Sequence, residues 1–129
     1  MITENHKIFV YSTDLDLCNS ISLLLQSKYQ IRYTTNSINI EDVDVDLLII
    51  DVPISDGNLL SKIKRIKTKY PKIKILLLYI YRMNETQLEA GYRKYSDFLL
   101  YKPIDVSQLT MAVDNLIVEK NKELLSNKK

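Results

Sequence analysis

Two charged residues stand where the chain could carry out chemistry on a phosphate group. Asp51 ends the most apolar segment of the sequence, and Lys102, followed by Pro103, ends another. A carboxylate can attack a phosphoryl group as a nucleophile, and an ammonium beside it can neutralise charge on the transferred oxygens. The step normally also needs a divalent metal ion held by further carboxylates. The pair therefore predicts phosphoryl transfer to Asp51, provided that the fold brings the two residues together.

Five short segments with the composition of β-strands must position these side chains. Runs rich in β-branched, aromatic and aliphatic residues predict strands. They are Lys7–Tyr11, Gln30–Thr34, Asp46–Asp51, Ile73–Tyr81 and Phe98–Tyr101. The third and fourth runs are apolar almost throughout, which is typical of strands covered on both faces.

Amphipathic segments separate these strands. Apolar residues recur with helical spacing after Asp14, after Asp56-Gly57, over Asn84–Tyr95 and after Asp105. The aspartates at these starts, with Asp16 in a first turn, fit helix caps and first-turn acids rather than metal ligands. Pro71 ends the second helix. The stretch Asn36–Val45 is too short and too weakly periodic to predict a helix.

The alternation of strands and helices predicts an α/β fold. We expect a doubly wound, five-stranded parallel sheet with helices on both faces, joined by right-handed crossovers. In such folds ligands collect at the carboxyl ends of the strands. The candidate site residues are those at strand ends: Ser12, Thr13, Asp51, Tyr79 and Lys102.

Length and composition exclude several classes of protein. The 129 residues fit one domain, and 46% hydrophobic with 26% charged residues excludes wholesale disorder. A net charge of +2 is too small for nucleic-acid binding by bulk charge, and the single Cys18 excludes a disulfide framework within one chain. The sequence has no signal peptide and no apolar run long enough to cross a bilayer, so we expect a cytoplasmic protein with no membrane partner.

The ordered set of motifs resembles the receiver domain of two-component response regulators, the CheY-like domain. The resemblance covers residues 6–120 and rests on five segments: Lys7–Asp16, Asp46–Asp51, Asp56-Gly57, Pro71–Leu78 and Leu99–Pro103. It implies flavodoxin-like receiver topology with strand order 2-1-3-4-5. It also implies one receiver-like domain over residues 1–129, in which residues 121–129 form a frayed helix end or the start of a linker.

The resemblance assigns roles to three residues. Asp51 matches the phosphoacceptor aspartate, and Lys102 matches the lysine that contacts the phosphoryl group. Tyr79 takes the position of the hydroxyl switch residue at the end of the fourth strand. The Lys102-Pro103 bond matches a peptide bond that is often cis in the family, and bonds before proline are those where cis costs little.

Five positions depart from the family pattern, Tyr79 among them. Ser12 and Thr13 stand where the family has the acidic pair that holds Mg²⁺, and Pro53 stands at a further metal-site position in a shortened loop. We therefore expect weak or absent metal binding, no cofactor unless the site retains Mg²⁺, and a direct Asp51–Lys102 pair. Leu99 replaces the aromatic residue of the fifth strand. Because Tyr79 is large and Leu99 has no ring to rotate, we expect the family's conformational switch to be disabled.

These departures favour a receiver-like signalling domain that is not an enzyme and acts mainly by protein–protein interaction, with impaired Mg²⁺-dependent phosphorylation. The alternative is a functional receiver that a histidine kinase phosphorylates on Asp51. A flavodoxin-like cofactor binder is a third hypothesis, but its phosphate-binding loop would need glycine, and Ser12-Thr13 supplies none.

Two clusters of residues bear on partners. The first cluster consists of four tyrosines, Tyr81, Tyr92, Tyr95 and Tyr101, and we expect one or two of them to pack in the core. The others predict a surface for a protein partner or a homodimer, formed by the counterparts of the family's fourth helix, fifth strand and fifth helix. The partner would be a histidine kinase or an output domain. The seven basic residues of Lys62–Lys74 suit either a nucleic-acid patch or a solvated helix face. We expect the solvated face and no direct nucleic-acid binding.

Overall fold

The structure, a computed structural model, describes residues 6–38, 44–53 and 57–126. The elements in these ranges are β1 (Lys7–Tyr11), α1 (Leu15–Leu25), β2 (Gln30–Thr34), β3 (Leu47–Asp51), α2 (Gly57–Lys69), β4 (Lys74–Tyr79), α3 (Thr86–Lys94), β5 (Phe98–Tyr101) and α4 (Val106–Ser126). The strands form one parallel sheet in the order β2-β1-β3-β4-β5. The predicted fold class and strand order are confirmed.

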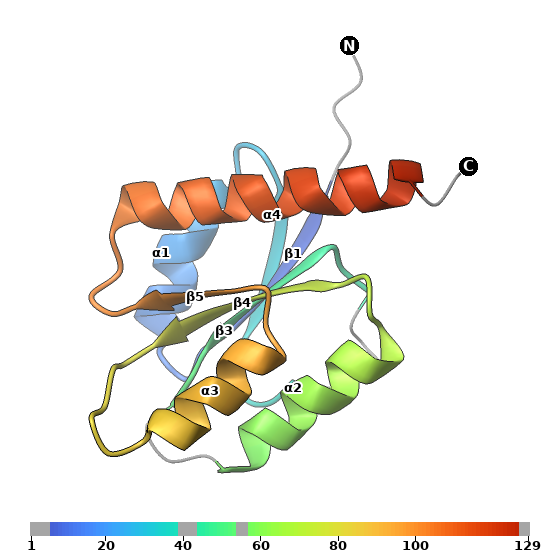
Figure 1. The fold of residues 1–129 in the computed structure, drawn as a ribbon. Coiled ribbons are helices and arrows are strands. Elements are labelled where there is room, and N and C mark those ends of the chain that lie inside the picture. The colour runs from blue at the N-terminus through green and yellow to red at the C-terminus, as the bar shows by residue number, and fades with distance from the viewer. Residues whose placement is uncertain (1–5, 39–43, 54–56, 127–129) are drawn as a thin grey trace.

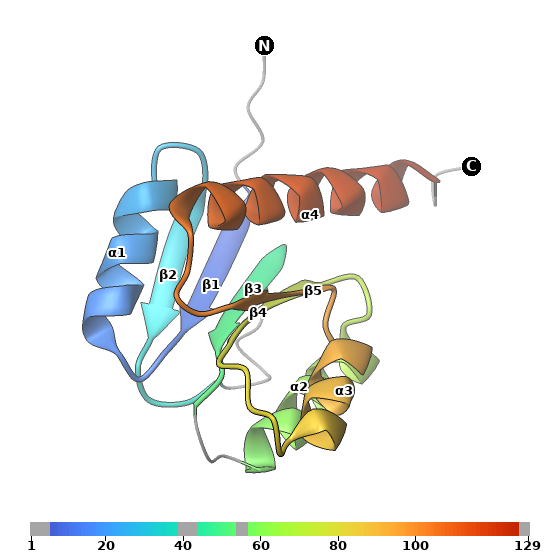
Figure 2. The same cartoon turned by 60° about the vertical axis from the view of Figure 1, so that its left-hand side comes forward.

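The sheet lies between two layers of helices (Figures 1 and 2). α1 and α4 cover one face, and α2 and α3 cover the other. The alternation of side chains along β3 explains this arrangement, since Leu47 and Ile49 pack in one hydrophobic cluster and Leu48 and Ile50 in the other. Every residue of β3 and β4 is buried, as the continuous apolar runs predicted.

Caps and breakers set the ends of the helices. Asp14 precedes α1 and its carboxylate accepts the Leu17 N–H at 3.2 Å, while Asp105 accepts the Gln108 N–H at 3.0 Å before α4. Both predicted caps are confirmed, but Asp56, the predicted start of α2, lies outside the described residues. No helix in the described part of the chain has the length and hydropathy that a membrane span requires.

Several element boundaries differ from the prediction, β3 and the start of β4 by one residue and others by more. β4 stops at Tyr79 because its pairing with β5 ends at Tyr79 and Tyr101, so the apolar Ile80 and Tyr81 lie exposed beyond the sheet. α3 begins at Thr86 rather than Asn84. α4 continues as a helix through Ser126, into the segment for which the sequence predicts fraying or a linker.

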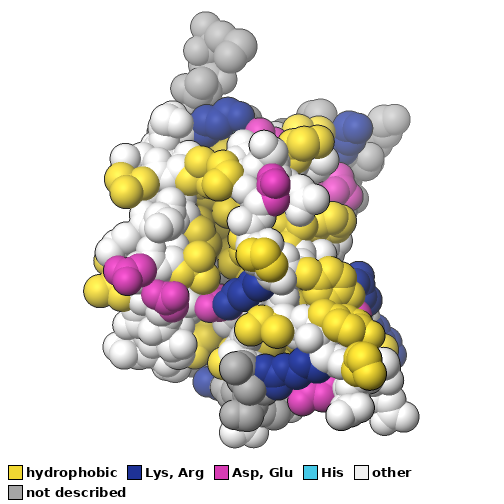
Figure 3. Space-filling view, turned by 90° about the vertical axis from the view of Figure 1, so that its left-hand side faces the viewer, with side chains coloured by type: hydrophobic (Ala, Val, Ile, Leu, Met, Phe, Trp, Pro, Cys, Tyr) yellow, Lys and Arg dark blue, Asp and Glu magenta, His cyan; other side chains and the backbone are white. Residues whose placement is uncertain are grey.

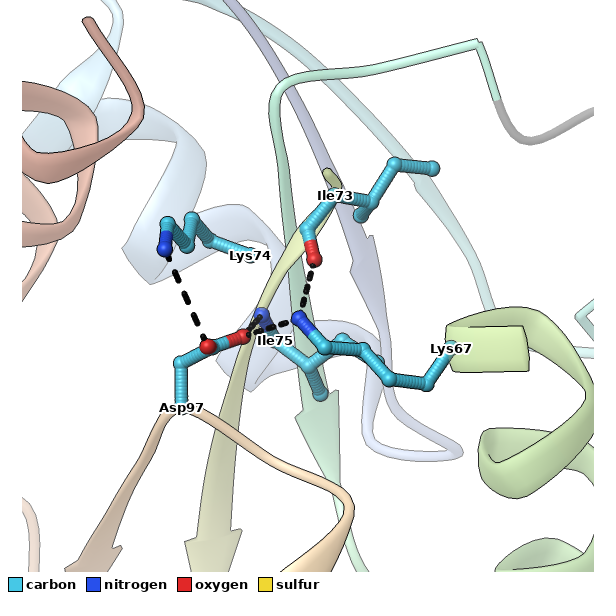
Figure 4. A network of polar contacts seen from close by, with 5 residues as sticks. All are labelled: Lys67, Ile73, Lys74, Ile75 and Asp97. Atoms are coloured by element: carbon cyan, nitrogen blue, oxygen red, sulfur yellow. Dashed lines mark hydrogen bonds and ion pairs between the residues drawn. The ribbon is translucent and has the colours of Figure 1, made fainter. Parts of the chain in front are cut away.

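A partly buried network of polar contacts fixes the amino-terminal end of β4 (Figure 4). Asp97, directly before β5, accepts the Ile75 N–H at 2.8 Å and a hydrogen bond from Lys67 Nζ at 2.9 Å. Lys67 Nζ also donates to the Ile73 carbonyl at 2.8 Å, and Lys74 Nζ lies 3.9 Å from the second carboxylate oxygen. Asp97 therefore ties the end of α2 to β4 and β5, at the edge of the sheet away from the candidate site.

Candidate functional site

Asp51 and Lys102 meet at the carboxyl edge of the sheet. Asp51 is the last residue of β3 and is only 7% exposed, and Lys102 directly follows β5. The Lys102 ammonium forms an ion pair with Asp51 Oδ1. The predicted direct pair is thus present. The Lys102-Pro103 bond is cis, as the resemblance implied.

Ser12 supplies the second partner of Asp51. This buried residue follows β1, and its hydroxyl donates to Asp51 Oδ2 at 2.6 Å. The same hydroxyl oxygen accepts the Asp14 N–H at 3.0 Å, because the chain turns here from β1 into the capped start of α1. The Cys18 thiol donates to the Ser12 carbonyl at 3.7 Å, and burial raises the pKa of this thiol. Ser12 is therefore held in place from both sides.

The two contacts occupy both oxygens of the Asp51 carboxylate. A hydroxyl proton faces Oδ2 and an ammonium faces Oδ1. Oδ2 receives a hydrogen bond, whereas Oδ1 has an ion pair and no hydrogen-bond partner among the described residues. Both contacts stabilise the negative charge of the carboxylate and hold it in one orientation. Figure 3 views this edge of the sheet, where acidic and basic side chains meet among hydrophobic ones.

The residues at the family's metal positions do not fit a Mg²⁺ ion. Mg²⁺ prefers several oxygen ligands in an octahedron, with carboxylates among them. Ser12 uses its hydroxyl proton on Asp51, the Thr13 side chain is exposed, and Pro53 carries no charged group. Asp14 instead caps α1. Within the described ranges, no three His, Cys, Asp or Glu side chains gather closely enough to hold a metal ion. Ile54 and Ser55 of the shortened loop lie outside those ranges.

Tyr79 lies in the core beside α3 instead of reaching Asp51. The residue is 4% exposed, and its ring contacts Tyr92 and Tyr101 at centroid distances of 5.7 and 6.5 Å. Its hydroxyl has no hydrogen-bond partner among the described residues. Burial, together with the nearby carboxylates Glu85 and Glu89, raises the pKa of this phenol. Leu99 packs in the same hydrophobic cluster.

The tyrosines predicted to bear on partners separate into two groups. Tyr92 is a core residue and Tyr95 is half-buried, whereas Tyr81 is 57% and Tyr101 39% exposed. The two exposed rings meet edge to face at 6.0 Å. Only Tyr81 and Tyr101 of this set therefore remain candidates for a partner surface.

The sequence did not reveal a polar cluster around Tyr101. The Tyr101 hydroxyl donates to Glu89 Oε2 at 2.6 Å and accepts from Arg93 Nη2 at 2.6 Å. Arg93 Nε donates to the same Glu89 oxygen at 3.2 Å, and these contacts raise the pKa of Arg93. The spacing of Glu89 and Arg93, four residues apart on a helix, is a signal that could have indicated the pair. Nothing in the sequence placed Tyr101 beside it.

Comparisons with known proteins agree with this architecture. The chain is 25% identical over 122 residues to the transcriptional regulatory protein ZraR of Klebsiella oxytoca, a match that covers 91% of this chain and 27% of that protein. The chain thus spans about a quarter of the length of this curated relative. No protein-family model matches the sequence.

Solved structures share the fold at low sequence identity. A CheY-like response regulator receiver domain protein of Methanospirillum hungatei matches with a TM-score of 0.82 at 16% identity, over 93% of this chain and 99% of that one. The BeF3-activated DrrB receiver domain matches with a TM-score of 0.73 at 20% identity, over 88% and 98%. A structure described as adenylate cyclase from Rhodopirellula baltica also matches, with a TM-score of 0.77 at 20% identity over 98% and 100%, so the fold alone does not fix an activity.

The parallel sheet of order 2-1-3-4-5 and its two helical layers agree with these solved structures. The chain therefore has the fold of CheY-like receiver domains, and its sequence is similar to part of a transcriptional regulatory protein.

Proposed function

We propose that this chain is a receiver-like signalling domain of a two-component phosphorelay whose Mg²⁺-dependent phosphorylation is impaired. It acts in the cytoplasm by binding a protein partner, a histidine kinase or an output domain, and is not itself an enzyme. The fold and the similarity to a transcriptional regulatory protein support the signalling role.

The proposal of impaired phosphorylation rests on one observation, that both carboxylate oxygens of Asp51 already contact another side chain. Its Oδ2 receives the Ser12 hydroxyl at 2.6 Å and its Oδ1 faces the Lys102 ammonium. In addition, the two acids that would hold a metal ion are replaced by uncharged residues. Removing one negative charge about 4 Å from a divalent ion forfeits roughly 8 kcal/mol at an effective dielectric near 20, before water takes the ligand's place. Even a small part of this loss weakens metal binding more than tenfold.

Incubation with acetyl phosphate and Mg²⁺ tests the impairment. The intact mass of the native chain is measured over time, beside Asp51→Asn and beside a receiver domain that retains its acidic pair. We expect no phosphate adduct on this chain under conditions that phosphorylate the second domain. An adduct of one phosphate that is absent from Asp51→Asn would overturn the proposal. The functional receiver phosphorylated on Asp51 would then be the better account.

The partner surface that we propose consists of α3, β5 and α4, the counterparts of the family's fourth helix, fifth strand and fifth helix. Apolar side chains stand exposed along it and on the loop before α3: Tyr81, Met83, Phe98, Tyr101, Val106 and Met111. Exposed aromatic residues and methionines are enriched at protein interfaces. A homodimer is the simplest assembly through this surface.

Substitution of the two exposed tyrosines tests this surface. We expect Tyr81→Ser/Tyr101→Ser to lower the dimer fraction, measured by sedimentation or light scattering at micromolar concentration. Tyr33→Ser, at a tyrosine of β2 that is 42% exposed, serves as the matched control and should leave the mass unchanged. If the native chain is monomeric at all concentrations, the homodimer is excluded and only a different protein partner fits the surface.

A further inference from the structure

The segment that forms α2 and the turn after it is strongly basic. From Gly57 to Lys74 the sequence has seven Lys and Arg residues and no Asp or Glu. The chain before Gly57 has the opposite character, with nine acidic and three basic residues. The small net charge of +2 therefore hides a marked separation of charge between two parts of one domain.

The packing of the fold accounts for two of these seven cations. Lys67 and Lys74 point toward Asp97 in the network at the start of β4 (Figure 4). Their ammonium groups lie 2.9 and 3.9 Å from its carboxylate oxygens. Asp97 is thus already engaged inside the domain, and its charge is not available to the cations farther out.

The other five of these cations, together with Lys94 of α3, make up a surface that we name the basic face. Its members are Lys62, Lys64, Arg65, Lys69, Lys72 and Lys94. Lys62 is half-buried and the others are exposed, and none of the six forms an ion pair with a described residue. α2 and α3 lie side by side on one face of the sheet (Figures 1 and 2). Lys64 of α2 and Lys94 of α3 both contact the ring of Tyr95.

Two tyrosines support the lysine side chains on this surface. Lys64 of α2 and Lys94 of α3 both lie over the Tyr95 ring, at 5.6 and 5.5 Å from its centroid. Lys69 lies over the Tyr70 ring at 5.4 Å. Each contact holds an extended cationic side chain against an aromatic face and lowers the entropy that it loses on binding an anion. The basic face is therefore partly preorganised.

We propose that the basic face docks an acidic segment of a protein partner. The six cations, five on α2 and α3 and one in the turn after α2, repel one another. α2 gains from the helix dipole only through the lysines in its last turn. An acidic segment relieves this repulsion by direct charge complementarity. α2, with 13 residues, is about 20 Å long and so matches a short peptide segment.

Two observations favour a polypeptide over a nucleic acid as the occupant. Single-stranded nucleic acids bind by stacking bases on free aromatic faces, but the rings of Tyr70 and Tyr95 already carry lysine ammonium groups. Outside Gly57–Lys74 the chain has sixteen acidic and eleven basic residues, so it offers a long duplex no excess of positive charge beyond that segment. A short acidic segment meets neither obstacle.

This inference deepens the proposed function, since it rests on the domain acting through protein contacts, but it does not depend on Asp51. The basic face lies on α2, α3 and the residues that flank them, whereas the impaired phosphorylation concerns the carboxyl edge of the sheet. Phosphorylation by acetyl phosphate and binding to the basic face are measured separately, so one proposal can fail while the other stands.

The test uses a fluorescein-labelled peptide of twelve residues rich in Glu and Asp, titrated with the full chain at low salt and followed by anisotropy. The face variant is Lys62→Gln/Arg65→Gln/Lys69→Gln. The matched control, Lys7→Gln/Arg32→Gln/Lys122→Gln, removes the same charge from exposed residues outside the basic face. Far-UV circular dichroism checks that both variants are folded.

We expect the face variant to bind the peptide about tenfold more weakly than the native chain, and the control to change the affinity less than about twofold. Binding by the native chain should weaken steeply as salt rises from 50 to 300 mM. An equal loss in both triple variants would overturn the proposal, because net charge alone would then explain the binding. Tighter binding of a twelve-base-pair DNA duplex than of the peptide at the same salt would assign the surface to nucleic acid instead.

Discussion

The hydroxyl of Ser12 donates a hydrogen bond of 2.6 Å to Asp51 Oδ2, at the position where receiver domains place an acid. The substitution changes the electrostatics of the site completely. Two carboxylates side by side repel each other and need a cation between them, whereas a hydroxyl and a carboxylate satisfy each other without one. The Lys102 ammonium completes the neutralisation of Asp51. We therefore expect the carboxyl edge of the sheet to be stable without a metal ion.

Acidic residues at positions 12 and 13 should make the stability of the domain depend on Mg²⁺. In Ser12→Asp/Thr13→Asp, a carboxylate lies buried beside Asp51, so the metal-free variant should be less stable than the native chain by about 2 kcal/mol or more. Addition of 10 mM Mg²⁺ should raise its melting temperature by about 3–5 °C, because an ion that binds only the folded state stabilises it. The native chain should shift by less than about 1 °C. Differential scanning fluorimetry measures both.

The uncharged pair Ser12→Asn/Thr13→Asn is the control for size and polarity in this experiment. It should not respond to Mg²⁺, since it adds no carboxylate. If the native chain shows the larger thermal shift with Mg²⁺, the account of the site as neutralised by Ser12 and Lys102 is wrong.

Removal of the Tyr79 hydroxyl should stabilise the domain. This hydroxyl is buried and has no hydrogen-bond partner among the described residues, so the folded state carries its desolvation cost without compensation. We expect Tyr79→Phe to raise the free energy of unfolding by about 0.5–1 kcal/mol. Tyr79→Thr, which has the residue size usual for the family, should instead destabilise by about 3 kcal/mol, because the ring fills space against Tyr92 and Tyr101. Urea unfolding followed by circular dichroism measures both changes, and a loss of stability in Tyr79→Phe would reveal a partner for the hydroxyl.

The sequence predicted the parts of the fold that depend on local pattern. The apolar run of β3 between Asp46 and Asp51 could only be covered on both faces, which required helices on either side of the sheet. Caps such as Asp14 and Asp105 fixed where helices begin. Once the strands were parallel, Asp51 and Lys102 had to lie at the same edge, and their pairing followed from charge.

Side-chain contacts between distant segments could not be predicted in this way. Ser12 was recognised as a departure from the family, but its hydrogen bond depends on the turn into α1, which points the hydroxyl at Asp51. The sequence around Tyr92 and Tyr101 does not predict that Tyr92 is buried and Tyr101 is exposed. This difference in exposure arises from the packing of α3 on the sheet. Lys74 is a buried cation because Asp97, 23 residues later, reaches it.

We expect the Asp97 carboxylate to contribute to the stability of the fold and to have no part in signalling. Asp97→Asn removes the negative charge that Lys67 and Lys74 share, although its amide oxygen can still accept the Ile75 N–H. We expect a loss of about 1–3 kcal/mol in urea unfolding. Asp97→Ala also leaves the Ile75 N–H without this acceptor and should cost more. Asp44→Asn, at an exposed aspartate, is the matched control and should change stability by less than about 0.5 kcal/mol.

Asp46 holds the amino-terminal edge of the sheet to α4. Its carboxylate accepts the Lys7 N–H at 2.9 Å, lies 3.0 Å from Lys120 Nζ and is 3.4 Å from His6 Nδ1. Burial alone would raise the pKa of Asp46, but these three groups outweigh it and hold the pKa below its ordinary value. A carboxyl group that binds protons more weakly in the folded state stabilises the fold at pH values above its unfolded pKa, near 4. This stabilisation is lost as the pH falls through the folded pKa.

The contribution of the Asp46 carboxylate to the free energy of unfolding should therefore be present at neutral pH and be lost in acid. At pH 7 we expect Asp46→Asn to lower the free energy of unfolding by about 1–2 kcal/mol, because the amide keeps the hydrogen bond to Lys7 but loses the attraction of Lys120. As the pH is lowered from 6 to 3, the gap between the native chain and the variant should narrow, since the native carboxyl becomes neutral as well. Urea unfolding at each pH measures the gap. A gap that stays constant down to pH 3 would mean that packing around Asp46, and not its charge, joins α4 to the sheet.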